Sequence, residues 1–173
     1  KGFGVGLMSS YGEGIALTPL QLAALVSALA NGGTLYYLQY PRSLQEVMEF
    51  TPKVKRAIDI EPWLSEITPG MMAAVEYGTA RRANHDLGAP ILGKTGTCTD
   101  RRTHLGWVGS FSQIGDQKLV VVVLLTGGRG VSGPAAAAIA GETYRRLARA
   151  EYLAHAPVFR PTPPFAAEAC CSQ

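Results

Sequence analysis

The sequence predicts an α/β fold of the α+β type, in which an antiparallel sheet is flanked by helices. Segments with helical periodicity precede, separate and follow two groups of strand-like segments, and a tight turn joins two of the last strands. Strands joined by so short a turn run antiparallel. The chain has 173 residues, of which 47% are apolar and 17% charged. This size and composition are typical of one globular domain or of part of a larger one.

The first helix is the most clearly marked element. Residues 2–14 contain five glycines and are expected to form a loop. Thr18 then precedes a proline and is followed three residues on by Gln21, which predicts a capping box at a helix start. Leucine and valine recur with helical spacing over 22–29. Asn31-Gly32-Gly33 is expected to end the helix, because these residues accept a left-handed backbone at low cost.

The middle of the chain predicts short strands and a second helix. Residues 34–40 are β-prone and end at Pro41, and residues 46–50 and 53–60 are further strand candidates. A second helix is expected to begin at Thr68-Pro69 and to run to about Ala83, since threonine and proline again form a start signal.

The last part of the chain predicts a sheet and a closing helix. Strands are expected at residues 90–97, 105–112 and 118–125, with a hairpin turn at 114–117. The third of these strands is apolar almost throughout, which predicts a central strand covered on both faces. A third helix is expected from Pro134, and the proline-rich residues 157–173 are expected to form a tail.

Composition argues against several classes of function. The net charge is only +3 and no block of Lys or Arg occurs, so nucleic-acid binding is not expected. The longest aliphatic run spans seven residues, 119–125, whereas a membrane span needs about 20. The three histidines and the three cysteines (Cys98, Cys170 and Cys171) lack the spacing of metal ligands. Neither a metal site nor a cofactor is therefore expected.

Residues 128–133 form a G-x-G-x-x-G pattern between an apolar strand and a helix, which is the context of a dinucleotide site. Such a site also needs a second strand after the helix, ending in an acidic residue. Here the helix leads into the proline-rich segment, and no second strand is predicted. Nucleotide binding is therefore not expected, and the pattern is interpreted as a turn.

The strongest chemical signal is Lys94-Thr95-Gly96-Thr97, referred to below as the KTGT motif. The two threonine hydroxyls can bind a substrate carboxylate, and the lysine adds positive charge and can tune a proton relay. A backbone N–H of the strand can donate to an oxyanion, and glycine lets a substrate backbone approach closely. Alternation places Thr95 and Thr97 on one face of the strand and Lys94 on the other. One site can use all three only if the strand is twisted or lies at an edge.

With this motif in place, residues 2–150 resemble the transpeptidase domain of penicillin-binding proteins. Gly93 and the KTGT motif are similar to the family's "GKTGT" motif. The other matching segments are residues 11–14 (family "GQG", here GEG), 17–23 ("TPLQLA"), 30–33 ("ANGG"), 70–71 with 78–80 ("GM…GTA") and 107–111.

The resemblance implies a partial penicillin-binding or serine β-lactamase-like transpeptidase fold, with an all-helical subdomain beside the sheet. It implies that a serine attacks the D-Ala–D-Ala end of a peptidoglycan stem peptide, that D-Ala leaves, and that a neighbouring amine takes the acyl group. β-Lactams acylate the same serine. The KTGT motif would be catalytic, with Thr95 and Thr97 binding substrate. The protein would lie at the extracytoplasmic (periplasmic) face of the bacterial cell membrane, anchored by an N-terminal segment absent from this chain.

The chain departs from the family in its serines. None of the nine has Lys three positions on or Asn two positions on, so the family's Ser-x-x-Lys and Ser-x-Asn motifs are missing. Residues 1–156 are therefore expected to be the C-terminal part of the domain, inactive alone and completed by its upstream half. A β-lactam hydrolase, a β-lactam sensor and a non-catalytic scaffold remain alternatives. Cys98 is interpreted as a small strand residue, and His104 as part of a loop. Trp107 and Phe111 are assigned to the core.

Overall fold

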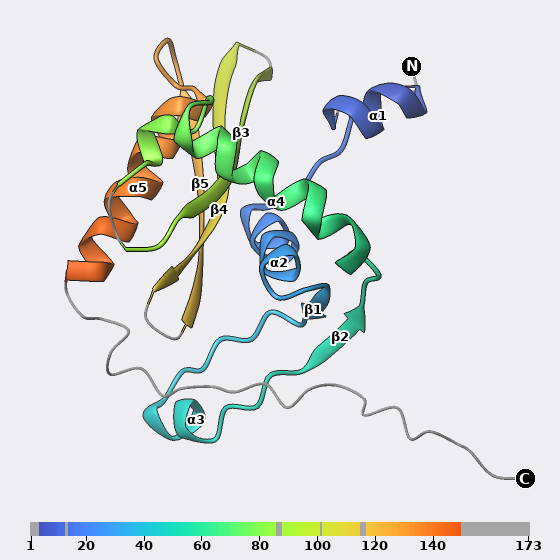
Figure 1. Cartoon of the computed structure of the whole chain (residues 1–173), viewed down its shortest axis with the longest axis vertical. Coiled ribbons are helices and arrows are strands. Elements are labelled where there is room, and N and C mark those ends of the chain that lie inside the picture. The colour runs from blue at the N-terminus through green and yellow to red at the C-terminus, as the bar shows by residue number, and fades with distance from the viewer. Residues whose placement is uncertain (1–3, 13, 86–87, 101, 115–116, 150–173) are drawn as a thin grey trace, which may run out of the picture.

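The computed structural model describes residues 4–12, 14–85, 88–100, 102–114 and 117–149. Figure 1 shows two sheets and the helices around them. The elements are α1 (Val5–Tyr11), α2 (Pro19–Ala30), β1 (Thr34–Tyr36), α3 (Leu44–Met48), β2 (Val54–Ala57), α4 (Glu61–Glu76), the 3₁₀ helix η1 (Arg81–Ala83), β3 (Ile91–Asp100), β4 (Thr103–Ile114), β5 (Gln117–Gly127) and α5 (Gly133–Arg149).

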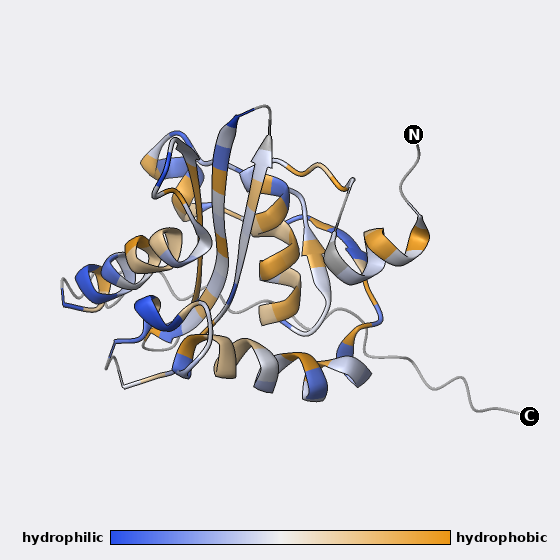
Figure 2. Cartoon of the chain, turned by 90° about the horizontal axis from the view of Figure 1, so that it is seen from above, coloured by the Kyte–Doolittle hydropathy of each residue, from blue (hydrophilic) through white to orange (hydrophobic). Residues whose placement is uncertain are grey.

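The main sheet is antiparallel and has the order β3-β4-β5, and β1 pairs with β2 in a separate sheet. Helix α2 lies on one face of the main sheet, and α5 lies on the other with α4 and η1 (Figures 1 and 2). Two neighbouring residues of β4 show the two faces. A Cβ placed on Gly109 would lie 2.9 Å from Val26 of α2, whereas Val108 packs with Ala136 and Ala140 of α5. The predicted antiparallel sheet flanked by helices is confirmed.

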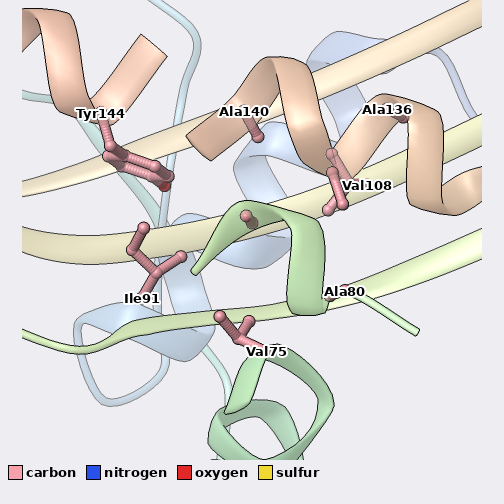
Figure 3. Packing of buried hydrophobic residues seen from close by; sticks show 9 residues of the cluster. Val75, Ala80, Ile91, Val108, Ala136, Ala140 and Tyr144 are labelled. Atoms are coloured by element: carbon pink, nitrogen blue, oxygen red, sulfur yellow. The ribbon is translucent and has the colours of Figure 1, made fainter. Parts of the chain in front are cut away.

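The core lies between the sheet, α4 and α5. Val75, Val108 and Tyr144 are fully buried there, with alanines of η1 and α5 filling the remaining space (Figure 3). The Tyr144 hydroxyl lies 3.1 Å from the Ser110 hydroxyl, which also donates to a β5 carbonyl. Burial raises the pKa of Tyr144 to about 12, although these hydrogen bonds act in the opposite direction. The phenol therefore stays protonated and fixes α5 on the sheet.

Helix α2 forms where its capping signals predict it. The Thr18 N–H donates to the Gln21 side chain at 2.8 Å, and the Gln21 N–H donates to the Thr18 hydroxyl at 3.2 Å. Gly32 and Gly33 have positive φ values of 87° and 113°, as the predicted helix end requires. At this end the ammonium of Lys118 on β5 donates to the Ala30 carbonyl, which fixes α2 to the sheet.

Two segments that the sequence predicts as a loop and as a strand form helices in the structure. Residues 5–11 form α1 and not a loop. Gly4 is the residue before the first helical turn, and Gly12, with φ 73°, ends the helix. Residues 46–50 overlap α3 and not a strand. Ser43 caps α3 by accepting from the Glu46 N–H at 3.1 Å, and the Glu46 carboxylate accepts from the Arg42 N–H. This local cap outweighs the weak strand propensity of the segment.

The starts of two elements and the position of one strand also differ. Helix α4 begins at Glu61 and not at Thr68, and Pro69 lies inside it. Pro69 leaves the Ser65 carbonyl without its helical donor, and the exposed position of Ser65 lets water supply one. Strand β4 begins at Thr103, so His104 lies in a strand and not in a loop. Strand β5 is an edge strand of the described sheet, not a central one, although α2 and α5 both contact it.

Some predictions fall outside the described residues. These are the tail at 157–173, with Cys170 and Cys171, and the two residues between β4 and β5. Across the described ranges, no helix combines the length and apolar character needed to cross a membrane.

Candidate functional site

The KTGT motif lies in the middle of β3, which forms one edge of the described sheet. Thr95 pairs with Val108 of β4 and Thr97 pairs with Gly106. Lys94, Thr95 and Thr97 can serve one site only if their strand is twisted or lies at the edge of a sheet. The edge position of β3 meets this condition. Thr95 is buried with 8% of its surface exposed, whereas Lys94 and Thr97 are exposed. The strand thus presents an ammonium and a hydroxyl to solvent next to a buried hydroxyl.

The two threonines face α4 and α5, as strand alternation predicts. The hydroxyls of Thr95 and Thr79 lie 2.6 Å apart. The Thr97 hydroxyl accepts a hydrogen bond of 2.8 Å from the N–H of Gly133, the first residue of α5. Because this contact uses a lone pair of Thr97 and not its proton, the Thr97 O–H can still donate to a ligand.

Lys94 belongs to the opposite face, since it pairs with Gly109, which faces α2. Its side chain nevertheless turns back to the strand, where the ammonium donates to the Thr95 carbonyl at 2.8 Å. The positive charge therefore lies next to the backbone of the motif, although the side chain as a whole is exposed. Together the ammonium and the threonine hydroxyls supply the donors that a carboxylate requires.

The start of α5 packs tightly against the back of the motif. A Cβ on Gly133 would lie 2.7 Å from the Thr95 Cβ and 3.2 Å from the Thr97 hydroxyl. A Cβ on Gly106 would lie 2.3 Å from the Ser132 carbonyl oxygen. Gly133, the last glycine of the G-x-G-x-x-G pattern, thus lets the backbone of α5 contact both threonines.

Gly96 differs from these glycines. A Cβ on Gly96 would lie 3.6 Å from the Trp107 Cβ, an ordinary contact, and its backbone is not in the left-handed region. Neither packing within the described chain nor backbone strain therefore requires glycine at this position.

The neighbouring residues that the sequence singled out are placed as follows. Cys98 is an exposed free thiol on β3, and the His104 ring nitrogen Nδ1 lies 3.2 Å from the Thr99 hydroxyl. Trp107 and Phe111 are half-buried in β4. Among the described residues, no group of three His, Cys, Asp or Glu side chains is close enough to hold a metal ion.

Thr79 is the residue near the motif that the sequence did not assign to the site. It belongs to the Gly78-Thr79-Ala80 triplet, one of the segments that resemble the transpeptidase family. Its contact with Thr95 joins positions 16 residues apart, and no periodicity of the sequence predicts it. The available signal was the similarity of this triplet to the "GTA" segment of the transpeptidase family.

Comparisons with known proteins show the family of the chain. The sequence profile described as "Penicillin binding protein transpeptidase domain" matches residues 4–145. Stage V sporulation protein D of Bacillus subtilis (strain 168) is 31% identical over a 153-residue alignment that covers 79% of this chain and 24% of that protein.

The fold has a solved relative. The D,D-transpeptidase domain of a peptidoglycan glycosyltransferase from Eggerthella lenta superposes with a TM-score of 0.54 and 19% identity, over 79% of this chain and 33% of that one. The chain therefore spans about a quarter to a third of the length of these two proteins. The profile match over most of the chain shows that it belongs to the penicillin-binding protein transpeptidase domain family.

Proposed function

We propose that this chain supplies the substrate-binding strand of a serine D,D-transpeptidase that cross-links peptidoglycan stem peptides. The observation that carries the proposal is the KTGT motif on the edge strand β3, where the Lys94 ammonium lies at the Thr95 carbonyl and the hydroxyls of Thr95 and Thr97 lie on neighbouring positions of the same strand face. Membership of the transpeptidase family supports the reaction class.

The carboxylate of the substrate is the group that this strand is suited to bind. On the proposal, the hydroxyls of Thr95 and Thr97 donate to the terminal carboxylate of D-Ala–D-Ala, and Lys94 supplies the positive charge. A hydrogen bond to a charged group contributes about 1.5–3 kcal/mol. The carboxylate of a β-lactam would occupy the same position, which explains why one strand serves substrate and inhibitor.

Gly96 gives the substrate backbone access to the strand. Since neither packing nor strain requires glycine there, we assign it to the close approach of an extended peptide that pairs with the open side of β3. The backbone N–H of Thr97 would then donate to the oxyanion that forms as the scissile carbonyl is attacked.

The nucleophile has to come from outside these residues. None of the nine serines has the lysine three positions on that would activate it. We propose that the upstream half of the same domain brings the Ser-x-x-Lys and Ser-x-Asn motifs to the open side of β3. Apolar side chains exposed on α1 and α2, including Val5 (81% exposed) and Leu20 (64% exposed), offer a surface for that half.

The reaction follows from this division of roles. The serine oxygen attacks the carbonyl of the penultimate D-Ala and transfers its proton to a neighbouring base. The base passes this proton to the nitrogen of the terminal D-Ala, which leaves as an amine, and an acyl-enzyme remains. An amine of a neighbouring stem peptide then attacks the ester and releases the serine. For this reaction we propose that the protein acts at the extracytoplasmic face of the membrane, where peptidoglycan lies. We also propose that residues 1–156 belong to the transpeptidase domain and that residues 157–173 lie outside it.

Covalent labelling tests the proposal. The gene-encoded protein, incubated with a labelled penicillin, is expected to carry one stable adduct on a Ser-x-x-Lys serine outside residues 1–173, seen by mass spectrometry of its peptides. The 173-residue chain alone, treated in parallel, is expected to carry none.

The other outcomes separate the rival functions. An adduct that forms and is hydrolysed within seconds would indicate a β-lactam hydrolase. A gene-encoded protein that is folded but unlabelled would indicate a scaffold. Labelling of any of the nine serines would contradict the assignment of the nucleophile to the upstream half.

A further inference from the structure

The hydroxyls of Thr79 and Thr95 form a short contact of 2.6 Å between the end of α4 and the KTGT motif. An O–H···O hydrogen bond holds one proton between its two oxygens, and either threonine can provide it. The direction of this bond determines what Thr95 can do. If Thr95 donates to Thr79, its proton is used inside the protein. If Thr79 donates to Thr95, the Thr95 proton is free for a ligand.

The backbone on both sides of Thr79 forms a hydrogen-bonded turn at the end of α4. The N–H groups of Tyr77 and Gly78 both donate to the Ala73 carbonyl, and the Ala80 N–H donates to the Ala74 carbonyl.

The two small neighbours of Thr79 fix this turn on both sides. A Cβ on Gly78 would lie 2.8 Å from the Ala74 Cα, so only glycine fits against α4 there. Ala80 is fully buried in the core shown in Figure 3. In this triplet Gly78 lets the turn pack against α4, and Ala80 packs in the core. Thr79 lies between them and faces Thr95.

A bound carboxylate favours one direction of the bond. A carboxylate only accepts hydrogen bonds, so it gains one from Thr95 only when Thr79 is the donor to Thr95. This arrangement forms a chain from Thr79 to Thr95 to the carboxylate, and hydrogen bonds in such a chain strengthen one another. Thr79 is exposed, so water can donate to its oxygen when Thr79 gives its own proton to Thr95. Thr95 is buried, so water reaches its oxygen less easily.

We propose that Thr79 is a positioning residue that donates its hydroxyl proton to Thr95 and thereby directs the Thr95 proton toward the carboxylate of the substrate. This inference rests on the proposed function, which assigns carboxylate binding to Thr95. It adds a residue of the α4–η1 turn to the recognition of the substrate, although that residue need not touch the substrate itself.

A purely structural role for Thr79 makes a different prediction. If its hydroxyl only attaches α4 to β3, its removal would affect every substrate equally. If it directs the Thr95 proton, its removal would affect only substrates that carry the carboxylate. Comparing a penicillin with its methyl ester separates the two, because the ester keeps the β-lactam ring and loses the anionic group.

The experiment measures second-order acylation rates of the gene-encoded protein with a penicillin and with its methyl ester. Thr79→Val is expected to slow acylation by the penicillin about 2- to 13-fold, the range for one lost hydrogen bond, and to change the ester rate by less than about twofold. Thr79→Ser keeps the hydroxyl and is expected to restore the penicillin rate. Thr143→Val is the matched control, since it removes a hydroxyl that donates to the Ile139 carbonyl within α5.

A double-mutant cycle tests whether Thr79 acts through Thr95. In a Thr95→Val background, Thr79→Val is expected to slow penicillin acylation by less than about a further twofold. The ester rate, measured on the same samples, reports the folded fraction, so a misfolded variant loses both rates together.

The outcomes distinguish this inference from the function on which it rests. If the unmodified protein reacts equally fast with penicillin and ester, the proposed carboxylate site fails and this inference fails with it. If the unmodified protein prefers the carboxylate and Thr79→Val keeps the full preference, only the role of Thr79 is overturned. Independent effects of Thr79→Val and Thr95→Val in the cycle would overturn it as well.

Discussion

Replacing Thr97 with valine tests two roles of one hydroxyl. In the structure the Thr97 hydroxyl accepts the N–H of Gly133 at 2.8 Å, and in the proposed site its proton binds the substrate carboxylate. Valine keeps the β-branched shape and the backbone N–H, so β3 should form as before. The substitution therefore removes one acceptor for α5 and one donor for the substrate.

The two losses have different magnitudes. Gly133 is buried, and a buried N–H that loses its partner costs about 1–3 kcal/mol. At about 2–4 °C per kcal/mol for a domain of this size, the melting temperature should fall by about 2–12 °C. A lost hydrogen bond to a charged carboxylate costs about 1.5–3 kcal/mol, or about 10- to 150-fold in rate if the bond is made in the transition state.

The assay compares Thr97→Val, Thr97→Ser and the parent in the gene-encoded protein. Second-order acylation by a penicillin is measured at matched folded fraction, and thermal unfolding is followed separately. Thr97→Ser keeps the oxygen and is expected to stay close to the parent in both measurements. Acylation of Thr97→Val at the parent rate would refute the assignment of the KTGT motif to the site. An unchanged melting temperature would refute the contribution of the Gly133 hydrogen bond.

Two further predictions concern the framework of the site. Since the pKa of Tyr144 is raised to about 12 in the folded protein and is about 10 when unfolded, its contribution to stability is complete below pH 10 and is lost as pH rises toward 12. Unfolding in urea should therefore become easier across this range, and Tyr144→Phe should make the decrease smaller; an equally steep decrease in both proteins would contradict this. Gly33→Ala should destabilise more than Gly32→Ala, because both residues have positive φ but only Gly33 would collide, 2.2 Å from the Ile58 carbonyl oxygen. Urea midpoints give the order, and equal midpoints would contradict it.

The elements that the sequence predicts well are those whose signals are local. Thr18, Pro19 and Gln21 lie within four residues, and together they satisfy the first turn of α2 without help from the rest of the chain. The alternation along β3 is equally local, and it correctly separates Thr95 and Thr97 from Lys94. Expectations of this kind hold because the backbone geometry of one element determines them.

Other features depend on contacts between elements or on competing local signals. The apolar run of β5 resembles a central strand, yet it forms an edge of the described sheet, where helices on both faces leave its residues half-buried. In α3 the cap formed by Ser43 and Glu46 competes with β-prone residues, and the sequence does not show which prevails. The contact of Thr79 with Thr95 depends on how α4 packs across the sheet. The sequence therefore singled out the KTGT strand and did not predict the contact of Thr79 behind it.

The arrangement behind the KTGT motif has a consequence for the charge of the ligand. A threonine hydroxyl has one proton and two lone pairs, so a neighbour that donates to it leaves the proton for another partner. For Thr97 that neighbour is the Gly133 N–H, which can only donate, and its position at the start of α5 adds the positive end of the helix dipole. On the proposed direction of the Thr79 bond, Thr95 is in the same state. On that proposal both threonines would offer protons to a ligand near the Lys94 ammonium, an arrangement suited to a carboxylate and not to an amide.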